Sequence, residues 1–180
     1  MDEFGINRKY HIGMYGGKFL PFHLGHRYCV EYAAAECDIV HVILFYGGKD
    51  EEDILEKCPE EWLRSEERRK KLEVLCKEVS SSFINMGKSV SIIPSFVDIS
   101  LLRLADGSED WDAETPLVRN ICGERIDAVY SSEISYGEYF SKAYPEAVHR
   151  LVDVPRIRYP ISGTKIRSLK NEEERRQWMV

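Results

Sequence analysis

Hydrophobic residues along the chain follow two patterns that predict alternating strands and helices. Some apolar segments are nearly continuous and rich in β-branched and aromatic residues, which is typical of strands buried on both faces of a parallel sheet. The clearest is "DIVHVILFY" at 38–46. Segments of this kind, and hence the expected strands, lie at 10–15, 38–46, 89–97, 126–132 and 147–154.

Between these segments, apolar residues recur at helical spacing. One stripe along the predicted helix 24–37 consists of Cys29, Val30, Ala33, Ala34 and Cys37. Further helices are expected at 65–79, 112–123 and 136–144, and from Ser162 onward. Strands separated by helices predict a Rossmann-like α/β fold, with a doubly wound parallel five-stranded sheet and helices on both faces.

Pro94 in the third expected strand indicates how the strands are ordered. Proline cannot donate a hydrogen bond to a neighbouring strand, so it belongs at a sheet edge or at the end of a strand. The common order 3-2-1-4-5 places this strand at the edge, and we expect that order, with a topological switch point between strands 1 and 4. Ligands bind beyond the carboxyl ends of strands at such a point, which places residues 16–26 and 131–133 on opposite sides of one crevice. The acidic segment 47–61 is the longest expected loop and a candidate for a mobile lid.

Composition narrows the class of protein. A chain of 180 residues is expected to form one domain, 1–180, and its net charge of −6 offers no basic face for nucleic acid. No segment approaches the roughly 20 apolar residues of a membrane span, and the first ten residues do not resemble a signal peptide. The five cysteines include no C-x-x-C pair, which favours reduced thiols over disulfides or a zinc site. These features predict a cytoplasmic protein.

The segment "GGKFLPFHLGH" at 16–26 joins the first strand to the first helix and carries the candidate chemistry. Gly16 and Gly17 let a ligand approach the backbone closely. The N–H groups at the start of the following helix favour a phosphate, and Lys18 adds a positive charge. The segment therefore predicts a phosphate-binding loop.

His23 and His26, three residues apart, are expected on one side of the first helical turn, where each imidazole can donate a hydrogen bond to a phosphate oxygen. Gly25 would leave room for a base or phosphate between the two rings. An H-x-x-H pair alone is a weak signal, because it would also cap a helix or bind a metal. The chain contains neither G-x-x-x-x-G-K-[ST] nor G-x-G-x-x-G, which disfavours a P-loop protein and a dinucleotide-binding dehydrogenase.

A second candidate phosphate site lies far along the chain, in "ISGTKIR" at 161–167. This segment opens the helical tail. It offers the hydroxyls of Ser162 and Thr164 at a helix start, with the guanidinium of Arg167 one turn later.

Together the two motifs resemble the nucleotidyltransferase superfamily marked by H-x-G-H and a C-terminal I-S-S-T-x-x-R motif. Within it, the chain resembles the nicotinamide-nucleotide adenylyltransferase domain of NadR-type proteins, through "GKF-x-P-x-H-x-G-H", "WD" at 111–112, "YSSE" at 130–133 and the "ISG" start of the last motif. Gly163 stands where the general signature has a second serine. The DNA-binding and kinase domains of full-length NadR-type proteins are not represented.

The resemblance implies transfer of AMP from ATP to the 5′-phosphate of nicotinamide mononucleotide, or of nicotinate mononucleotide, with release of pyrophosphate. Mg²⁺ would enter as Mg-ATP, without metal ligands from the protein. The implied catalytic residues are His23, His26 and Arg167. The implied ATP-binding residues are Gly16, Gly17, Lys18, Phe19, Ser162 and Thr164. The expected acceptor-binding residues are Trp111, Ser132 and Glu133, although Trp111 would equally suit a half-buried structural position.

Other functions stay open at this point. The H-x-G-H motif handles a nucleoside triphosphate and says little about the acceptor, which leaves phosphopantetheine, FMN or a phospho-alcohol accepting CMP. A non-catalytic sensor of ATP or NAD is a second class, and a class I aminoacyl-tRNA synthetase fragment ranks last because the chain has no K-M-S-K-S-like loop. The expected partners are small molecules, without nucleic acid or membrane, and the sequence leaves a homo-oligomer open.

Overall fold

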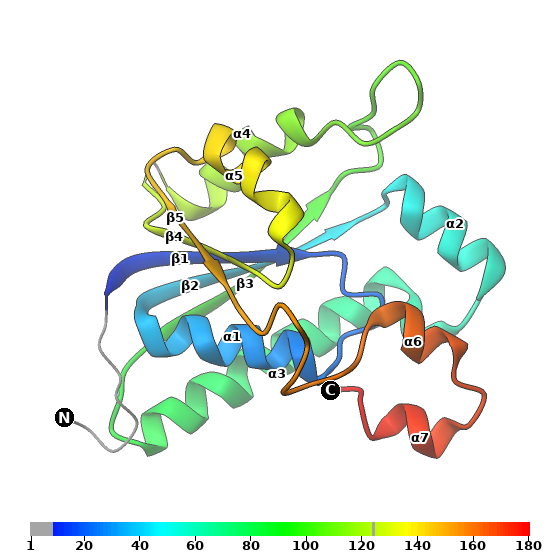
Figure 1. The fold of residues 1–180 in the computed structure, drawn as a ribbon, viewed down its shortest axis with the longest axis horizontal. Coiled ribbons are helices and arrows are strands. Elements are labelled where there is room, and N and C mark those ends of the chain that lie inside the picture. Colours follow the sequence, from blue (N-terminus) through cyan, green and yellow to red (C-terminus); the bar gives the residue numbers. More distant parts are fainter. Residues whose placement is uncertain (1–8, 124) are drawn as a thin grey trace.

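The computed structural model describes residues 9–123 and 125–180, and Figure 1 shows its ribbon. A five-stranded sheet with the order β3-β2-β1-β4-β5 lies at its centre. The strands are β1 (Tyr10–Gly17), β2 (Cys37–Tyr46), β3 (Ser91–Asp98), β4 (Ala128–Ser131) and β5 (Val148–Leu151). Every neighbouring pair is parallel. The predicted Rossmann-like sheet and its strand order are confirmed.

Helices cover both faces of the sheet (Figure 1). One face carries α1 (Leu24–Glu36) and α3 (Ser65–Asn85), and the other carries α4 (Trp111–Cys122) and α5 (Gly137–Ala143). The remaining helical segments are α2 (Lys49–Lys57), α6 (Gly163–Ser168), α7 (Glu172–Arg176) and the 3-10 turns η1 (Glu61–Leu63) and η2 (Ile134–Tyr136). No helix in the described part of the chain is long and apolar enough to cross a membrane.

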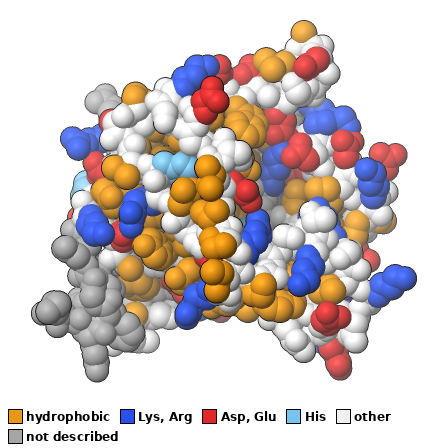
Figure 2. Space-filling model, in the orientation of Figure 1, with side chains coloured by type: hydrophobic (Ala, Val, Ile, Leu, Met, Phe, Trp, Pro, Cys, Tyr) orange, Lys and Arg blue, Asp and Glu red, His pale blue; other side chains and the backbone are white. Residues whose placement is uncertain are grey.

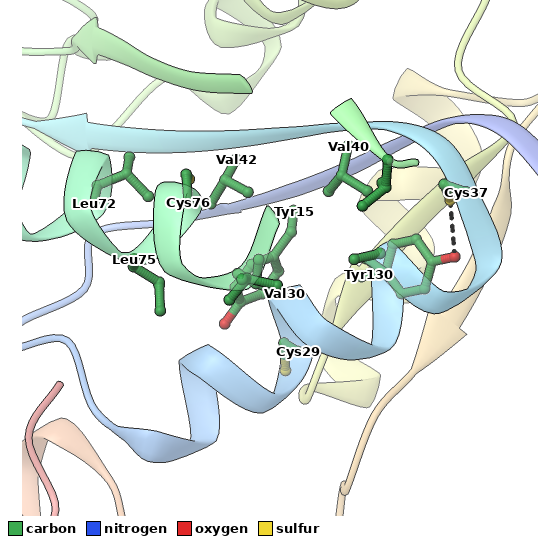
Figure 3. Packing of buried hydrophobic residues seen from close by; sticks show 14 of the residues in the cluster. Tyr15, Cys29, Val30, Cys37, Val40, Val42, Leu72, Leu75, Cys76 and Tyr130 are labelled. Carbon is green, nitrogen blue, oxygen red and sulfur yellow. Dashed lines mark hydrogen bonds between the residues drawn. The ribbon is translucent and has the colours of Figure 1, made fainter. Parts of the chain in front are cut away.

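The hydrophobic core is divided between the two faces of the sheet. Beneath the strands, Val30 of α1 and Leu72 and Leu75 of α3 pack in the same cluster as Tyr15 and Val42 (Figure 3). A second cluster lies between the opposite face and the α4–α5 side. Because both faces are covered, the central strands are apolar on both sides, which explains their uninterrupted hydrophobic runs.

The cysteines are free thiols, as predicted. Cys29, Cys37 and Cys76 are buried in the cluster below the sheet, where they act as small core residues. The Cys37 sulfur lies 3.2 Å from the hydroxyl of Tyr130, a contact drawn in Figure 3.

Pro94 lies in β3 at the edge of the sheet, opposite Val42 of β2. The edge position predicted from its missing N–H is confirmed. On the face of the molecule seen in Figure 2, basic and acidic side chains are interspersed rather than gathered by sign.

The segment 47–61 is not the irregular loop that the sequence suggests, because it contains α2 and ends where η1 begins. Acidic residues occupy the first turn of α2, where they interact favourably with the positive end of the helix dipole. One of them, Glu51, is buried and ion-paired with the buried guanidinium of Arg68 in α3. The sequence does not reveal this helix, since its anchoring pair joins two separate elements.

Candidate active site

The loop between β1 and α1 meets the end of β4 at the carboxyl edge of the sheet, as the predicted switch point requires. Between them lies a cavity of about 180 Å³, which we call the histidine cavity. The residues predicted from sequence that line it are Gly16, Gly17, Lys18, Phe19, His23, His26, Ser132 and Glu133. Both sides of the predicted crevice are therefore present.

His23 and His26 stack on each other, with ring centroids 3.6 Å apart and ring planes 20° apart. His23 is the N-cap of α1, and its backbone N–H donates to Nδ1 of His26 over 3.3 Å. Because Nδ1 of His26 accepts this bond, the neutral ring carries its proton on Nε2. Nδ1 of His23 is buried and has no hydrogen-bond partner among the described residues.

Both imidazoles are neutral at ordinary pH. Burial, reinforced by the charge of Arg156, lowers the pKa of His23 from 6.5 to about 4. Burial, followed by the neighbouring His23 and Arg156, lowers the pKa of His26 well below its ordinary value. A neutral imidazole still donates one hydrogen bond, from the ring nitrogen that carries its proton. The pair therefore provides hydrogen-bond donors and no permanent charge.

Aromatic side chains hold the histidine rings in place. Phe19 stacks on Phe22 at a centroid distance of 4.2 Å, and its ring meets His26 edge-on at 5.0 Å. Phe19 is itself buried and has a positive φ of 51°. Its side chain thus supports the histidines from within the core, while the residue also lines the cavity.

Gly25 makes room for a side chain of the histidine pair, and not for a ligand as the sequence suggested. A Cβ at this position would lie 3.0 Å from Cε1 of His23, so the glycine makes room for the His23 ring itself. The stacked rings leave no space for a base or phosphate between them. The prediction that Gly25 leaves room for a ligand between the two rings is therefore wrong.

Lys18 is ion-paired with two carboxylates beside the loop. Its ammonium lies 2.6 Å from Asp50 of α2 and 2.6 Å from Glu109. Burial alone would lower the pKa of Lys18, but its bonds to these carboxylates raise it above the ordinary value. A phosphate that binds Lys18 must compete with both acidic groups.

The C-terminal motif supports the loop from the other side. Ser162 caps α6, with its hydroxyl accepting from the N–H of Lys165 over 3.2 Å. The guanidinium of Arg167 donates to the carbonyl of Leu20 and, over 3.2 Å, to the hydroxyl of Thr164. Ser162, Thr164 and Arg167 lie outside the described lining of the histidine cavity. The structure thus brings Gly163 and Arg167 of this motif to the loop, while Ile161 is part of the cavity wall.

Gly163 is explained by this contact with the loop. A Cβ at position 163 would lie 2.5 Å from the carbonyl oxygen of Leu20 and 3.1 Å from a nitrogen of Arg167. Glycine allows α6 to approach the loop closely enough for Arg167 to bind that carbonyl. The departure from the general serine-containing signature therefore has a packing reason in this chain.

From the sequence, Arg156 was expected, with Arg158, only to flank the last motif and add to its positive field, and not to form part of the cavity wall. Arg156 lines the histidine cavity and donates to the carbonyl of Ile161 over 2.6 Å and to Glu133 over 2.8 Å. The chain turns sharply here, since Asp153 and Arg156 both have positive φ and Asp153 accepts from three following N–H groups. The only sequence signal was a cation shortly before the last motif, which does not reveal this turn.

A second cavity, of about 230 Å³, adjoins the first, and the two share Gly16, Gly17, Lys18 and Tyr136 in their linings. We call it the aromatic cavity. Trp111 lies on its wall with 40% of its surface exposed. Its indole meets Tyr136 and Tyr139 edge-on, at 5.6 Å and 5.3 Å. The expected acceptor residues are therefore divided, because Ser132 and Glu133 line the other cavity.

A parallel sheet of order 3-2-1-4-5, with an H-x-G-H loop at its switch point, places the chain in the class of Rossmann-like nucleotidyltransferases. The family model described as Cytidylyltransferase-like matches residues 14–169, and the chain belongs to this family. It also shares its fold with the solved structure of NadR protein in complex with NAD and AMP-PNP, at 20% identity and a TM-score of 0.58. That match covers 96% of this chain but 46% of the other, so the chain spans about half of its length. No curated protein matches the chain.

Proposed function

We propose that the protein transfers AMP from ATP to the 5′-phosphate of nicotinamide mononucleotide, giving NAD and pyrophosphate. The observation that carries the proposal is the pair of adjoining cavities with a common wall at Gly16, Gly17, Lys18 and Tyr136. A transfer between two bound substrates needs such an arrangement, with the reacting groups meeting at the shared wall. The solved NadR complex, with NAD and AMP-PNP, supports the choice of substrates.

The reaction needs no nucleophile from the protein. An oxygen of the acceptor phosphate attacks the α-phosphorus of ATP, the new P–O–P bond forms, and the bond from the α-phosphorus to the pyrophosphate oxygen breaks. The protein's task is to position the substrates and to stabilise charge on the phosphate oxygens. We assign this task to the donor at Nε2 of His26 and to His23, which share one wall of the histidine cavity.

The positive charge of the site comes from side chains and from the nucleotide's own metal. No group of three potential metal ligands is found in residues 9–123 and 125–180. We propose that Mg²⁺ enters on the phosphates, as Mg-ATP. Arg156 faces the histidine cavity, and Lys18 would exchange its carboxylate partners for phosphate oxygens. We assign Arg167 mainly to positioning the loop, and with Thr164 to the departing pyrophosphate.

A second candidate is cytidylyl transfer from CTP to a phospho-alcohol. The matching family model is described as Cytidylyltransferase-like, which favours neither ATP nor a nicotinamide acceptor. The aromatic cavity supports the first candidate, because Trp111, Tyr136 and Tyr139 suit a planar ring better than an aliphatic alcohol.

The test is pyrophosphate release in the presence of Mg²⁺, with ATP or CTP and a panel of acceptors. The panel contains nicotinamide and nicotinate mononucleotides, FMN, phosphopantetheine and phospho-alcohols. Release that requires ATP and nicotinamide mononucleotide, with NAD as the second product, is the expected result. Release only with CTP and a phospho-alcohol would establish the second candidate, and ATP binding without any release would indicate a sensor.

A further inference from the structure

Acidic side chains reach the aromatic cavity from two helices and the segment between them. Asp50 comes from α2, Glu109 precedes α4, and Glu114 lies within α4. Asp50 and Glu109 are both ion-paired with Lys18. Glu114, in contrast, has no hydrogen-bond or ion-pair partner in the part of the chain that the structure describes.

The unpaired Glu114 carboxyl lies beside the aromatic wall. Trp111 stands one turn earlier on the same helix, and both residues line the cavity. Tyr139 fixes this wall, because its hydroxyl donates to the carbonyl of Trp111 over 2.8 Å. The same hydroxyl lies 3.0 Å from the hydroxyl of Thr115. The wall thus offers a flat, electron-rich surface next to a carboxyl group that is available to a ligand.

We propose that Glu114 determines the acceptor specificity of the aromatic cavity, favouring a mononucleotide ring with an uncharged amide over one with a carboxylate. The inference rests on the proposed function, in which this cavity holds the acceptor. A pyridinium ring is a cation and stacks favourably on an indole. Its amide N–H can donate to Glu114, whereas a ring carboxylate in the same place meets a like charge.

The acidity of Glu114 provides an independent signature. Burial, followed by the charge of Glu109, raises the pKa of Glu114 to about 7, and Lys18 opposes this shift. Glu114 therefore changes from mainly protonated to mainly ionised between pH 6 and pH 8. The charged and titratable groups that surround it are Lys18, Asp50, Glu109, Asp110, Tyr136, Tyr139 and Tyr144. Titration of the acceptor phosphate is common to both mononucleotides and cancels in their ratio.

The experiment measures binding and turnover separately. Calorimetry gives the dissociation constants of nicotinamide mononucleotide and nicotinate mononucleotide, and pyrophosphate release with ATP gives kcat/KM for each. The variants are Glu114→Gln and, as a matched control, Glu138→Gln, an exposed glutamate of α5 outside both cavities. We expect the native protein to bind the amide about tenfold more tightly at pH 8, and less selectively at pH 6. Glu114→Gln should bring the ratio within about threefold at both pH values, and Glu138→Gln should leave it unchanged.

Equal binding of the two mononucleotides by the native protein, or an unchanged ratio in Glu114→Gln, overturns the inference. Selective binding that is lost in Glu114→Gln but accompanied by no pyrophosphate release supports the inference and refutes adenylyl transfer. Failure of both mononucleotides to bind refutes both proposals. If Glu114→Gln does not fold, the native protein still tests the inference, because equal binding of the two mononucleotides overturns it.

Discussion

The neutral state of His23 predicts that acid destabilises the protein through this residue. His23 is buried, with 4% of its surface exposed, and its folded pKa of about 4 lies below the ordinary 6.5. Between these values the unfolded chain binds a proton that the folded protein does not. The contribution of His23 to stability is therefore complete above pH 6.5 and is lost as the pH falls from 6.5 towards 4.

The size of the effect follows from the two pKa values. For folded and unfolded pKa values of about 4 and 6.5, linkage gives a loss of about 2 kcal/mol between pH 7 and pH 4.5. A loss of this size is a substantial part of the 5–15 kcal/mol or so that stabilises a typical domain. His26 should add a loss in the same direction, because its pKa is also lowered by burial.

The assay is urea unfolding at pH 7 and pH 4.5 for the native protein and for His23→Gln. Carboxylates also titrate over this range, in both proteins. We therefore compare the loss in free energy of unfolding from pH 7 to pH 4.5 in the native protein with the same loss in His23→Gln. His23→Gln should lose about 2 kcal/mol less than the native protein on acidification. The matched control is His11→Gln, at an exposed histidine of β1, where the ion pair with Asp38 lies at the surface and contributes little to stability. Parallel losses in the native protein and His23→Gln would refute a neutral buried His23.

Three further substitutions test the site and its support. His26→Ala should lower the rate of pyrophosphate release by about 10²–10³-fold without changing the circular dichroism, since it removes a donor to the phosphates; an unchanged rate would contradict its role. Gly163→Ser should cost about 1–3 kcal/mol in urea unfolding, because its Cβ meets the carbonyl of Leu20, and equal stability would show that α6 shifts freely. Arg68→Met should lower the free energy of unfolding by about 3–5 kcal/mol, because it leaves the buried charge of Glu51 without its cation; in Arg68→Met/Glu51→Leu much of this loss should be recovered, and no recovery would show that the loss comes from the other bonds of Arg68, to the carbonyls of Leu63 and Lys18.

The arrangement of strands could be predicted from the sequence because it depends on local patterns. Continuous apolar runs marked the buried strands, and Pro94 marked the edge. The helix in segment 47–61 could not be predicted in this way. Its acidic residues resemble a solvent-exposed loop, and the burial of Glu51 is explained by its ion pair with Arg68 and by the N–H of Gly47, which donates to the same carboxylate.

The candidate site was predictable to a similar degree. The strand order placed the H-x-G-H loop and the end of β4 at one cavity, as expected. The division between the two cavities was not predictable, because it depends on how Trp111 packs against Tyr136 and Tyr139. Nor did the motif reveal that Gly25 accommodates the His23 ring, since spacing alone does not give the distance between two rings.

The loop is held by segments that follow the last strand of the sheet in the chain. The N–H of Leu24 donates to the carbonyl of Trp178 over 2.9 Å, His23 forms a β-bridge with Met179, and Arg167 binds the carbonyl of Leu20. A nascent chain that has emerged as far as β5 has every strand it needs to build the sheet, but it lacks all three of these contacts. Such long-range contacts form late in folding. The histidines should therefore reach their final geometry only after the segments beyond β5 have packed against the loop, so the sheet by itself does not fix the pair.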